Sequence, residues 1–139
     1  MSRKSWGMLS VLGGLLLATL PVVAHHSIAS EFDFEKELEL KGTLKRMDWI
    51  TPHPILHLEV TNQDGTKTVW LFQSANSLLG TGVTAVLRKA PSQGGLEREK
   101  TYTFTGFKAK NGKSMAFLKA VKMEDGRVVT AWFGDPNGE

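Results

Sequence analysis

All four histidines of the chain lie between positions 25 and 57, and two of them are adjacent: His25, His26, His53 and His57. Imidazole nitrogens bind copper, zinc, iron and nickel, and they also act as general acids and bases. The chain has no cysteine, which excludes disulfides, thiolate catalysis and cysteine-ligated zinc or iron–sulfur sites. The histidines are therefore the side chains that point most directly to chemistry.

A peptidase cut between Ala24 and His25 would give the mature chain an N-terminal histidine. The free amine and the ring Nδ1 of that residue form a chelate around one metal ion, and a second imidazole opposite them completes a T-shaped set of three nitrogens. Nitrogen donors in tetragonal geometry select Cu(II) over Zn(II). His53 is the expected third ligand, because Pro54 pushes it toward an extended conformation at the mouth of the second strand. We therefore expect copper to be bound by His25 and His53, with His26 as a less suited candidate.

Two other interpretations of these histidines stay open. The adjacent pair is also compatible with a solvent-exposed polar stub, and His53 with a turn residue bonded to the backbone. A cut before Ala24 would place His26 third, which gives a different copper chelate of the amine, two backbone amides and the His26 ring. The metal hypothesis therefore depends on the position of the cut.

Five further residues are weaker candidates. Asp33 is close to the expected terminus and could orient a histidine ring by accepting its N–H, with a solvated acidic patch as the alternative. Trp49 and Trp70 are candidates for stacking against a ligand on a barrel face, with core packing as the alternative. Asn76 follows the third expected strand, in a segment typical of a helix N-cap. His57 shares the outward parity of its strand, and we expect it to be solvated.

Motifs of the common enzyme classes are absent from the sequence. It has no glycine-rich phosphate loop, no G-x-S-x-G elbow and no H-E-x-x-H helix, and no catalytic residue is predicted. The sequence therefore favours a binding protein over an enzyme. The alternatives are a metal-free module that binds a small ligand or a periplasmic protein partner, and a copper-dependent oxidative enzyme.

The first 24 residues have the layout of a secretory signal peptide. Arg3 and Lys4 form a positive region, residues 8–20 are mostly apolar, and Val22 and Ala24 occupy the −3 and −1 positions of a cut. The apolar stretch is shorter than the ~20 residues of a spanning helix, so no stable membrane span is expected after cleavage. Export and the absence of cysteine together indicate a bacterial periplasmic or secreted protein.

Removal of this leader changes the charge balance. The whole chain has 17 basic and 14 acidic residues, and loss of Arg3 and Lys4 leaves 15 basic residues. The mature protein is therefore close to neutral, and its charges are interspersed rather than gathered in a stripe. These features argue against a nucleic-acid partner.

Alternation of apolar and polar residues predicts five or six strands, separated by Asp-Gly and Asn-Gly turns. They cover residues 37–44, 55–60, 66–73, 101–109, 114–123 and 128–133. In the first strand the inward parity ends at Leu44 and resumes at Met47, which predicts a bulge at Lys45-Arg46. Helical spacing over residues 78–87 predicts a short helix between the third and fourth strands.

This order of elements predicts an all-β domain with a short helix, of the small OB-like type: a five- to six-stranded antiparallel barrel with its helix between strands three and four. A small open sheet with one covering helix is the alternative. We expect a signal peptide over 1–24, an N-terminal arm over 25–35, an OB-like β-barrel domain over 36–133 and a flexible tail over 134–139. Within the arm we expect Ile28, Phe32 and Phe34 to pack.

Four stretches of the chain resemble a family of small exported bacterial proteins, the domain-of-unknown-function family 6152. They are AHHSIASEFD, LKGTLKRMDWITPHPILHLEV, VWLFQSANSLL and YTFTGFKAKNGKSMAFLKAV, and they span essentially the whole mature chain. The AHHS and Pro-His-Pro segments carry the specificity of the match. The resemblance implies a single exported domain without an assigned activity.

Eight residues fall on positions that mark this family: His25, His26, Asp33, Trp49, Pro52, His53, Trp70 and Asn76. Thr51 stands where members usually have asparagine, and the loop KAPSQGGLEREK is longer than usual. His57 has no counterpart, which lowers its standing as a ligand. Neither departure affects the paired histidines. The sequence thus predicts a periplasmic copper-binding protein, accessory to metal handling or to a periplasmic redox system.

Overall fold

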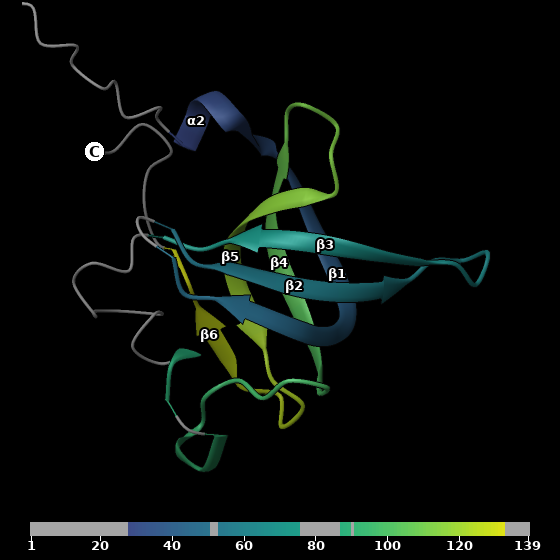
Figure 1. The fold of residues 1–139 in the computed structure, drawn as a ribbon. Helices are drawn as coiled ribbons and strands as arrows, with labels where there is room; N and C mark the ends of the chain where they lie inside the picture. The colour runs from purple at the N-terminus through teal and green to yellow at the C-terminus, as the bar shows by residue number, and fades with distance from the viewer. Residues whose placement is uncertain (1–27, 51–52, 76–86, 90, 133–139) are drawn as a thin grey trace, which may run out of the picture.

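The structure, a computed structural model, describes residues 28–50, 53–75, 87–89 and 91–132. In this part of the chain one short helix, α2 (Ile28–Glu31), precedes six strands (Figure 1). The strands are β1 (Phe32–Asp48), β2 (Ile55–Thr61), β3 (Lys67–Gln73), β4 (Thr101–Ala109), β5 (Met115–Lys122) and β6 (Val128–Thr130), with a 3-10 turn, η1 (Pro91–Gln93), before β4. The predicted all-β class with a short helix is confirmed.

The strand pairings close a ring of five strands. Neighbours follow the order β3-β2-β1-β4-β5, and β5 returns to β3 through the pair Phe72 and Ala116. Four of these pairings are antiparallel, but β3 and β5 run parallel. One parallel pair is required here, because five strands cannot alternate in direction all the way round a ring.

The length of β1 lets it take part in two pairings. It pairs with β4 as far as Thr43 and with β2 from Thr43 onward. Its register on β2 shifts between Leu44 and Arg46, which confirms the predicted bulge. The strand begins at Phe32, earlier than predicted. This early start was missed because a second register shift, between Phe32 and Glu37, interrupts the pairing of β1 with β4 and hides the alternation in the sequence.

The larger of two hydrophobic clusters is built from the inward positions of the strands. Its buried members are Leu44, Leu56, Leu58, Val60, Phe72, Leu87, Leu96, Tyr102, Phe104, Ala116, Leu118, Val121, Met123 and Ala131. Leu56 and Leu58 are fully buried, whereas His57 between them is only partly buried. The inward parity predicted for β2 is therefore confirmed.

A second cluster ties α2 and the start of β1 to the rest of the fold. Its buried members are Phe32, Phe107, Ala109 and Phe117. Ile28 and Phe34 pack against it, and the ring centroid of Phe34 lies 5.1 Å from that of Trp132. The expected packing of Ile28, Phe32 and Phe34 is confirmed, with these residues belonging to α2 and β1.

Three predicted segments fall outside the described residues. They are the leader over 1–24, the tail over 134–139 and nearly all of the helix predicted over 78–87. Of that helix, Leu87 is described, and it is buried. Among the described ranges, no helix has the length and apolar character that crossing a membrane requires.

Candidate functional site

His53 lies immediately before β2, where the β2–β3 ladder ends. The ladder is extended by one bond beyond the strands, because the backbone N–H of Ser74 donates to the carbonyl oxygen of Pro54 at 2.8 Å. Next to this bond, Nδ1 of His53 lies 3.1 Å from the carbonyl oxygen of Ser74. A carbonyl oxygen only accepts, so Nδ1 carries the proton and Nε2 holds the free lone pair of the neutral ring. A metal-binding histidine is typically oriented in this way.

The residues that hold the ring of His53 are themselves buried. Pro54 is fully buried and Ser74 is 1% exposed, whereas His53 is partly buried. The backbone N–H and carbonyl of Ser74 are both used, but its Oγ has no hydrogen-bond partner among the described residues. Ser74 therefore positions His53 through its main chain, and its side chain contributes no contact to that task.

The first described residues and the segment after Ser74 contact the same hydrophobic cluster. Ile28 and Ala75 pack against the same second hydrophobic cluster, and Ala75 directly follows the residue that holds His53. Lys110 fixes α2 further, since its backbone N–H donates to Glu31 at 2.9 Å and its Nζ to the carbonyl oxygen of Ala29 at 2.6 Å. Ile28 of α2 and the segment that follows Ser74 therefore border one hydrophobic cluster.

Three of the predicted site residues lie outside the described residues. They are the metal-ligand candidates His25 and His26, and Asn76, which was predicted to follow the third strand. Among the residues that the structure describes, no group of three or more histidine, aspartate or glutamate side chains could hold a metal ion. His53 is thus the one predicted metal ligand that falls in the described ranges, and a complete copper site would need donors from outside them.

Asp33 is engaged by neighbours on its own strand. Its Oδ2 lies 2.9 Å from Nζ of Lys36, and its Oδ1 accepts from the backbone N–H of Glu35 at 3.2 Å. The hydrogen bond from Lys36 holds the pKa of the Asp33 carboxyl below its usual value. No contact joins Asp33 to His53 in the described part of the chain.

Both tryptophans named as ligand candidates pack against the larger cluster. Trp70 is paired with the fully buried Leu58 across β2 and β3, so its side chain points to the inner face. Trp49 also stacks with a cation, because the guanidinium carbon of Arg88 lies 4.9 Å from its ring centroid. These contacts are those of packing residues.

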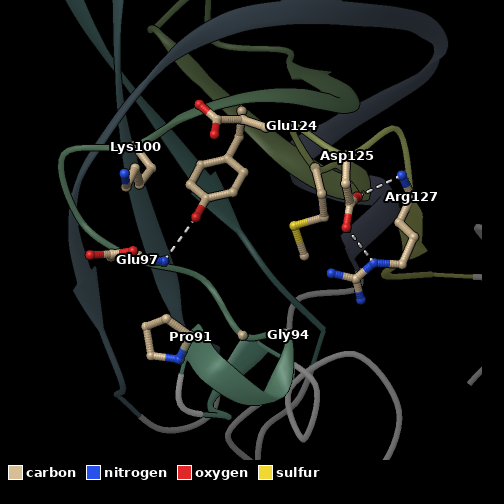
Figure 2. Close-up of a pocket in the computed structure, with 10 residues that line it drawn as sticks. Pro91, Gly94, Glu97, Lys100, Glu124, Asp125 and Arg127 are labelled. Carbon is tan, nitrogen blue, oxygen red and sulfur yellow. Dashed lines mark hydrogen bonds and ion pairs between the residues drawn. The ribbon is translucent and has the colours of Figure 1, made fainter.

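Two hollows are lined in part by residues of the β5–β6 turn. This turn lies at the end of the molecule opposite α2 (Figure 1). The first, of about 240 Å³, is lined by Pro91, Gly94, Gly95, Glu97, Lys100, Tyr102, Met123, Glu124, Asp125 and Arg127 (Figure 2). Inside it the hydroxyl of Tyr102 accepts from the backbone N–H of Glu97 at 2.9 Å, and Asp125 holds Nε of Arg127 at 2.9 Å. The second hollow, of about 540 Å³, adjoins the first at Tyr102. None of the site residues predicted from the sequence lines either hollow.

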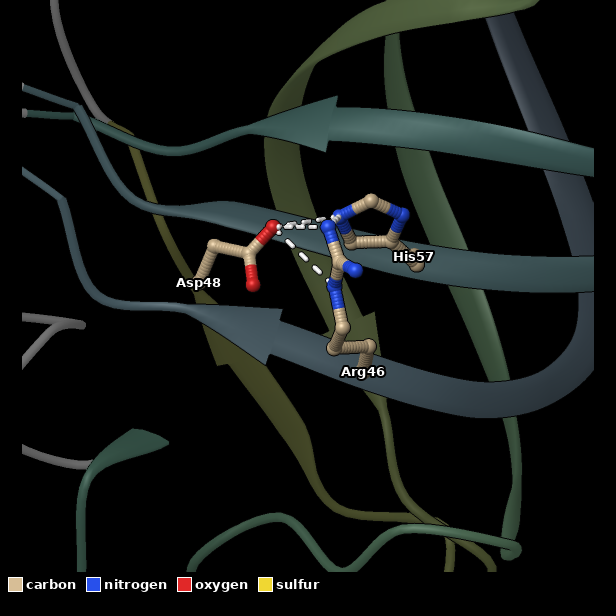
Figure 3. Close-up of polar contacts among 3 residues, drawn as sticks. All are labelled: Arg46, Asp48 and His57. Atoms are coloured by element: carbon tan, nitrogen blue, oxygen red, sulfur yellow. Dashed lines mark hydrogen bonds and ion pairs between the residues drawn. The ribbon is translucent and has the colours of Figure 1, made fainter.

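The outer face of β1 and β2 carries a polar trio of Arg46, Asp48 and His57 (Figure 3). Oδ2 of Asp48 accepts from Arg46 at 2.7 Å through Nη2 and at 3.2 Å through Nε. Nε2 of His57 lies 2.8 Å from the same oxygen and 3.4 Å from Nη2 of Arg46. Because a carboxylate oxygen only accepts, Nε2 donates to Asp48.

The trio acts as an electrostatic tie between two strands. Hydrogen bonds from Arg46 and then from His57 hold the pKa of the Asp48 carboxyl below its usual value of 3.8, and desolvation of the carboxylate opposes them. The side chains of His57 and Asp48 are 17% and 29% exposed. Neither hollow borders the trio, so we assign it a structural role.

The sequence contained the signal that locates this trio. Once the bulge shifts the parity of β1, Arg46 and Asp48 face outward like His57, and Arg46 is directly paired with His57. The expectation of a merely solvated His57 overlooked this pairing. The bond from His53 to Ser74 had no such signal, because it joins a side chain to a backbone oxygen across two strand ends.

A family model described as "Family of unknown function (DUF6152)" matches residues 14–116. The match includes β1 to β4 and the first residues of β5. Comparisons with curated proteins and with solved structures found no match to this chain.

Proposed function

Since this chain belongs to the family of unknown function DUF6152, its membership brings no activity, and we propose from its own residues that it is an exported copper-binding protein. In this proposal His25 supplies its amine and its ring, and His53 supplies Nε2. His26 is a further candidate ligand. The role is metal handling or support of a periplasmic redox system, without turnover by this protein.

The observation that carries the proposal is the orientation of His53. Its Nδ1 is bonded to the carbonyl oxygen of Ser74 at 3.1 Å, so the free lone pair is on Nε2. Nitrogen donors from imidazole and amine groups suit Cu(II), and an imidazole held through its other nitrogen loses little conformational freedom on binding a metal. A bound copper ion would supply redox chemistry or Lewis acidity at this end of the ring.

The N-terminal segment that would carry the other donors is short. His25 precedes Ile28 by three residues, and three residues span at most about 10–11 Å. Ile28 packs against the cluster that also receives Ala75, next to the residue that holds His53. In the proposal, a mature chain beginning at His25 turns back toward the ring of His53 while α2 stays folded.

Export is the second part of the proposal. Residues 1–24 have the positive, apolar and small-residue regions of a cleavable leader. Cleavage after Ala24 is what creates the amine ligand, so export and copper binding are linked in this protein. The intact mass of the protein recovered from the periplasm of a bacterial host tests the first step, and a chain that retains its leader would exclude the amine chelate.

Copper binding is tested on the mature protein by titration with Cu(II), followed by electron paramagnetic resonance. We expect nitrogen hyperfine structure, and a loss of affinity of at least about tenfold in His53→Ala, comparable to the loss on removing a group that merely orients a ligand. His57→Ala is the matched control, because His57 lies on β2, four residues after His53, with its Nε2 committed to Asp48.

Three outcomes would contradict the proposal. Equal copper affinity of the two variants would exclude His53 as a ligand. A copper affinity of the protein no higher than that of a free peptide with the sequence HHSIAS would show that the folded domain contributes nothing to binding. A variant that retains Ala24 would form the different chelate through His26, so an unchanged affinity together with an unchanged nitrogen hyperfine pattern in this variant would exclude the terminal amine of His25 as a ligand. A metal-free binding module would then be the better account of this fold.

A further inference from the structure

Lys41, Thr103 and Lys122 form one row across three strands. Lys41 of β1 is paired with Thr103 of β4, and Thr103 is paired with Lys122 of β5. Directly paired residues on neighbouring strands project from the same face. Thr103 alternates with the buried Tyr102 and Phe104, so the row lies on the outer face of the sheet.

This row forms one side of the larger hollow beside the β5–β6 turn. The hollow has a volume of about 540 Å³ and is lined by Lys41, Thr101, Tyr102, Thr103, Lys122, Met123 and Glu124. Its lining residues therefore include two lysines, two threonines, one tyrosine and one glutamate. It adjoins the hollow in Figure 2, in which Lys100 and Glu124 are labelled.

The two lysines of the row differ from other lysines of the same strands. Lys36 and Lys45 of β1 are paired with Asp33 and Glu99, at 2.9 and 2.6 Å, and Lys119 of β5 is paired with Glu37. In the described ranges no carboxylate lies within ion-pair distance of Lys41 or Lys122.

The spacing of the row suits an anion held between the lysines. Neighbouring strands lie about 4.8 Å apart, so the backbones of Lys41 and Lys122 are about 10 Å apart, with Thr103 between them. Each ammonium group is carried on a flexible four-carbon stem that can lean over Thr103. The hydroxyls of Thr101 and Thr103 add donors to the floor.

We propose that this hollow binds a phosphate-type oxyanion on a small soluble ligand, with Lys41 and Lys122 as its cationic contacts. Lysine binds phosphate as a point charge, which fits two lysines of one row without a planar fork. Glu124 at the rim repels such a ligand and keeps its affinity modest. The site uses none of the histidines and does not depend on the proposed copper site.

The test is a titration of the mature protein with inorganic phosphate, followed by the backbone amide signals in two-dimensional NMR. Chloride replaces phosphate at equal ionic strength in the reference titration, which removes general screening. We expect saturable shifts confined to Lys41, Thr101, Thr103, Lys122 and their sequence neighbours.

Substitutions then identify the contacts. For exposed charges of this kind we expect about three- to fivefold weaker binding in Lys41→Ala or Lys122→Ala, about tenfold or more in the double variant, and tighter binding in Glu124→Gln. Lys113→Ala is the matched control, because Lys113 is an exposed lysine in the β4–β5 turn, outside the hollow. The thermal midpoint of each variant shows that it is folded.

A separate arm distinguishes a soluble phosphate from a lipid headgroup. Vesicles of phosphatidylglycerol should not bind the protein more strongly than vesicles of phosphatidylcholine. Several results would overturn the proposal: shifts that follow chloride equally, a Lys41→Ala and Lys122→Ala double variant that binds phosphate like Lys113→Ala, or binding to anionic vesicles without any response to inorganic phosphate.

Discussion

Gly106 lies where β3 and β5 close the ring, and replacing it with alanine tests that closure. A Cβ at this position would lie 2.6 Å from the carbonyl oxygen of Phe117, 3.0 Å from Cε1 of Phe72 and 3.3 Å from Cβ of Ala116. Phe72 and Ala116 are the central pair of the β3–β5 contact. The added methyl group therefore pushes on both strands of the one parallel pairing.

The magnitude follows from how little these neighbours can move. Phe72 and Ala116 are fully buried, and the closest atom belongs to the backbone, so no flexible side chain can simply swing away. Overpacking of this kind costs about 1–3 kcal/mol of stability. The unfolded chain with alanine has less conformational entropy than the unfolded chain with glycine, which offsets about 0.4–1 kcal/mol of this cost. We expect Gly106→Ala to lower the free energy of unfolding by about 1–2 kcal/mol, which is about 4–16 °C in the thermal midpoint of a domain this size.

Urea unfolding of the mature protein and amide hydrogen exchange together measure this effect. Protection should fall most at the amide of Leu71, which donates to the carbonyl oxygen of Ser114 at 3.0 Å, because this bond borders the β3–β5 pairing. Thr105→Ala, one residue away with its side chain on the outer face, should change stability by no more than about 0.5 kcal/mol. Wild-type stability and wild-type protection of Leu71 in Gly106→Ala would show that β3 and β5 do not close as described.

Two further predictions concern the surroundings of the candidate sites. Folding lowers the pKa of Asp48 through hydrogen bonds from Arg46 and His57. The stabilising contribution of Asp48 is therefore complete above its usual pKa of 3.8 and is lost as the pH falls through the lower folded-state pKa. In urea unfolding series from pH 7 to pH 2.5, Asp48→Asn should reduce the loss of stability at acid pH, and an unchanged pH dependence would contradict a stabilising role of these hydrogen bonds. Ser74→Ala removes a buried hydroxyl without a partner in the described part of the chain but keeps the carbonyl oxygen that holds His53. Thermal unfolding should therefore show equal or slightly higher stability, and copper titration should show an unchanged affinity. A clear loss of stability or of copper affinity would mean that the hydroxyl has a partner.

The described part of the candidate copper site was only partly predictable. Position before a proline identified His53 as an extended residue near the start of β2, and this is where it lies. Its proton position was not predictable, because it depends on a carbonyl oxygen of Ser74, twenty-one residues away in the sequence. The Arg46–Asp48–His57 trio could have been predicted from the sequence. The alternation of β1 after its bulge and the alternation of β2 together place all three side chains on the outer face.

Local patterns in the sequence determined which residues form strands, which side chains of β2 and β4 face inward and where β1 bulges. These properties follow from the two-residue period of a strand and from the burial of apolar side chains, and both are written in consecutive residues. Tertiary structure alone decided the parallel pairing of β3 with β5, the second cluster that joins Ile28 to Ala75, and the row of Lys41, Thr103 and Lys122. Each of these depends on register between strands far apart in the chain, and register is set by the packing of the whole ring rather than by any single segment.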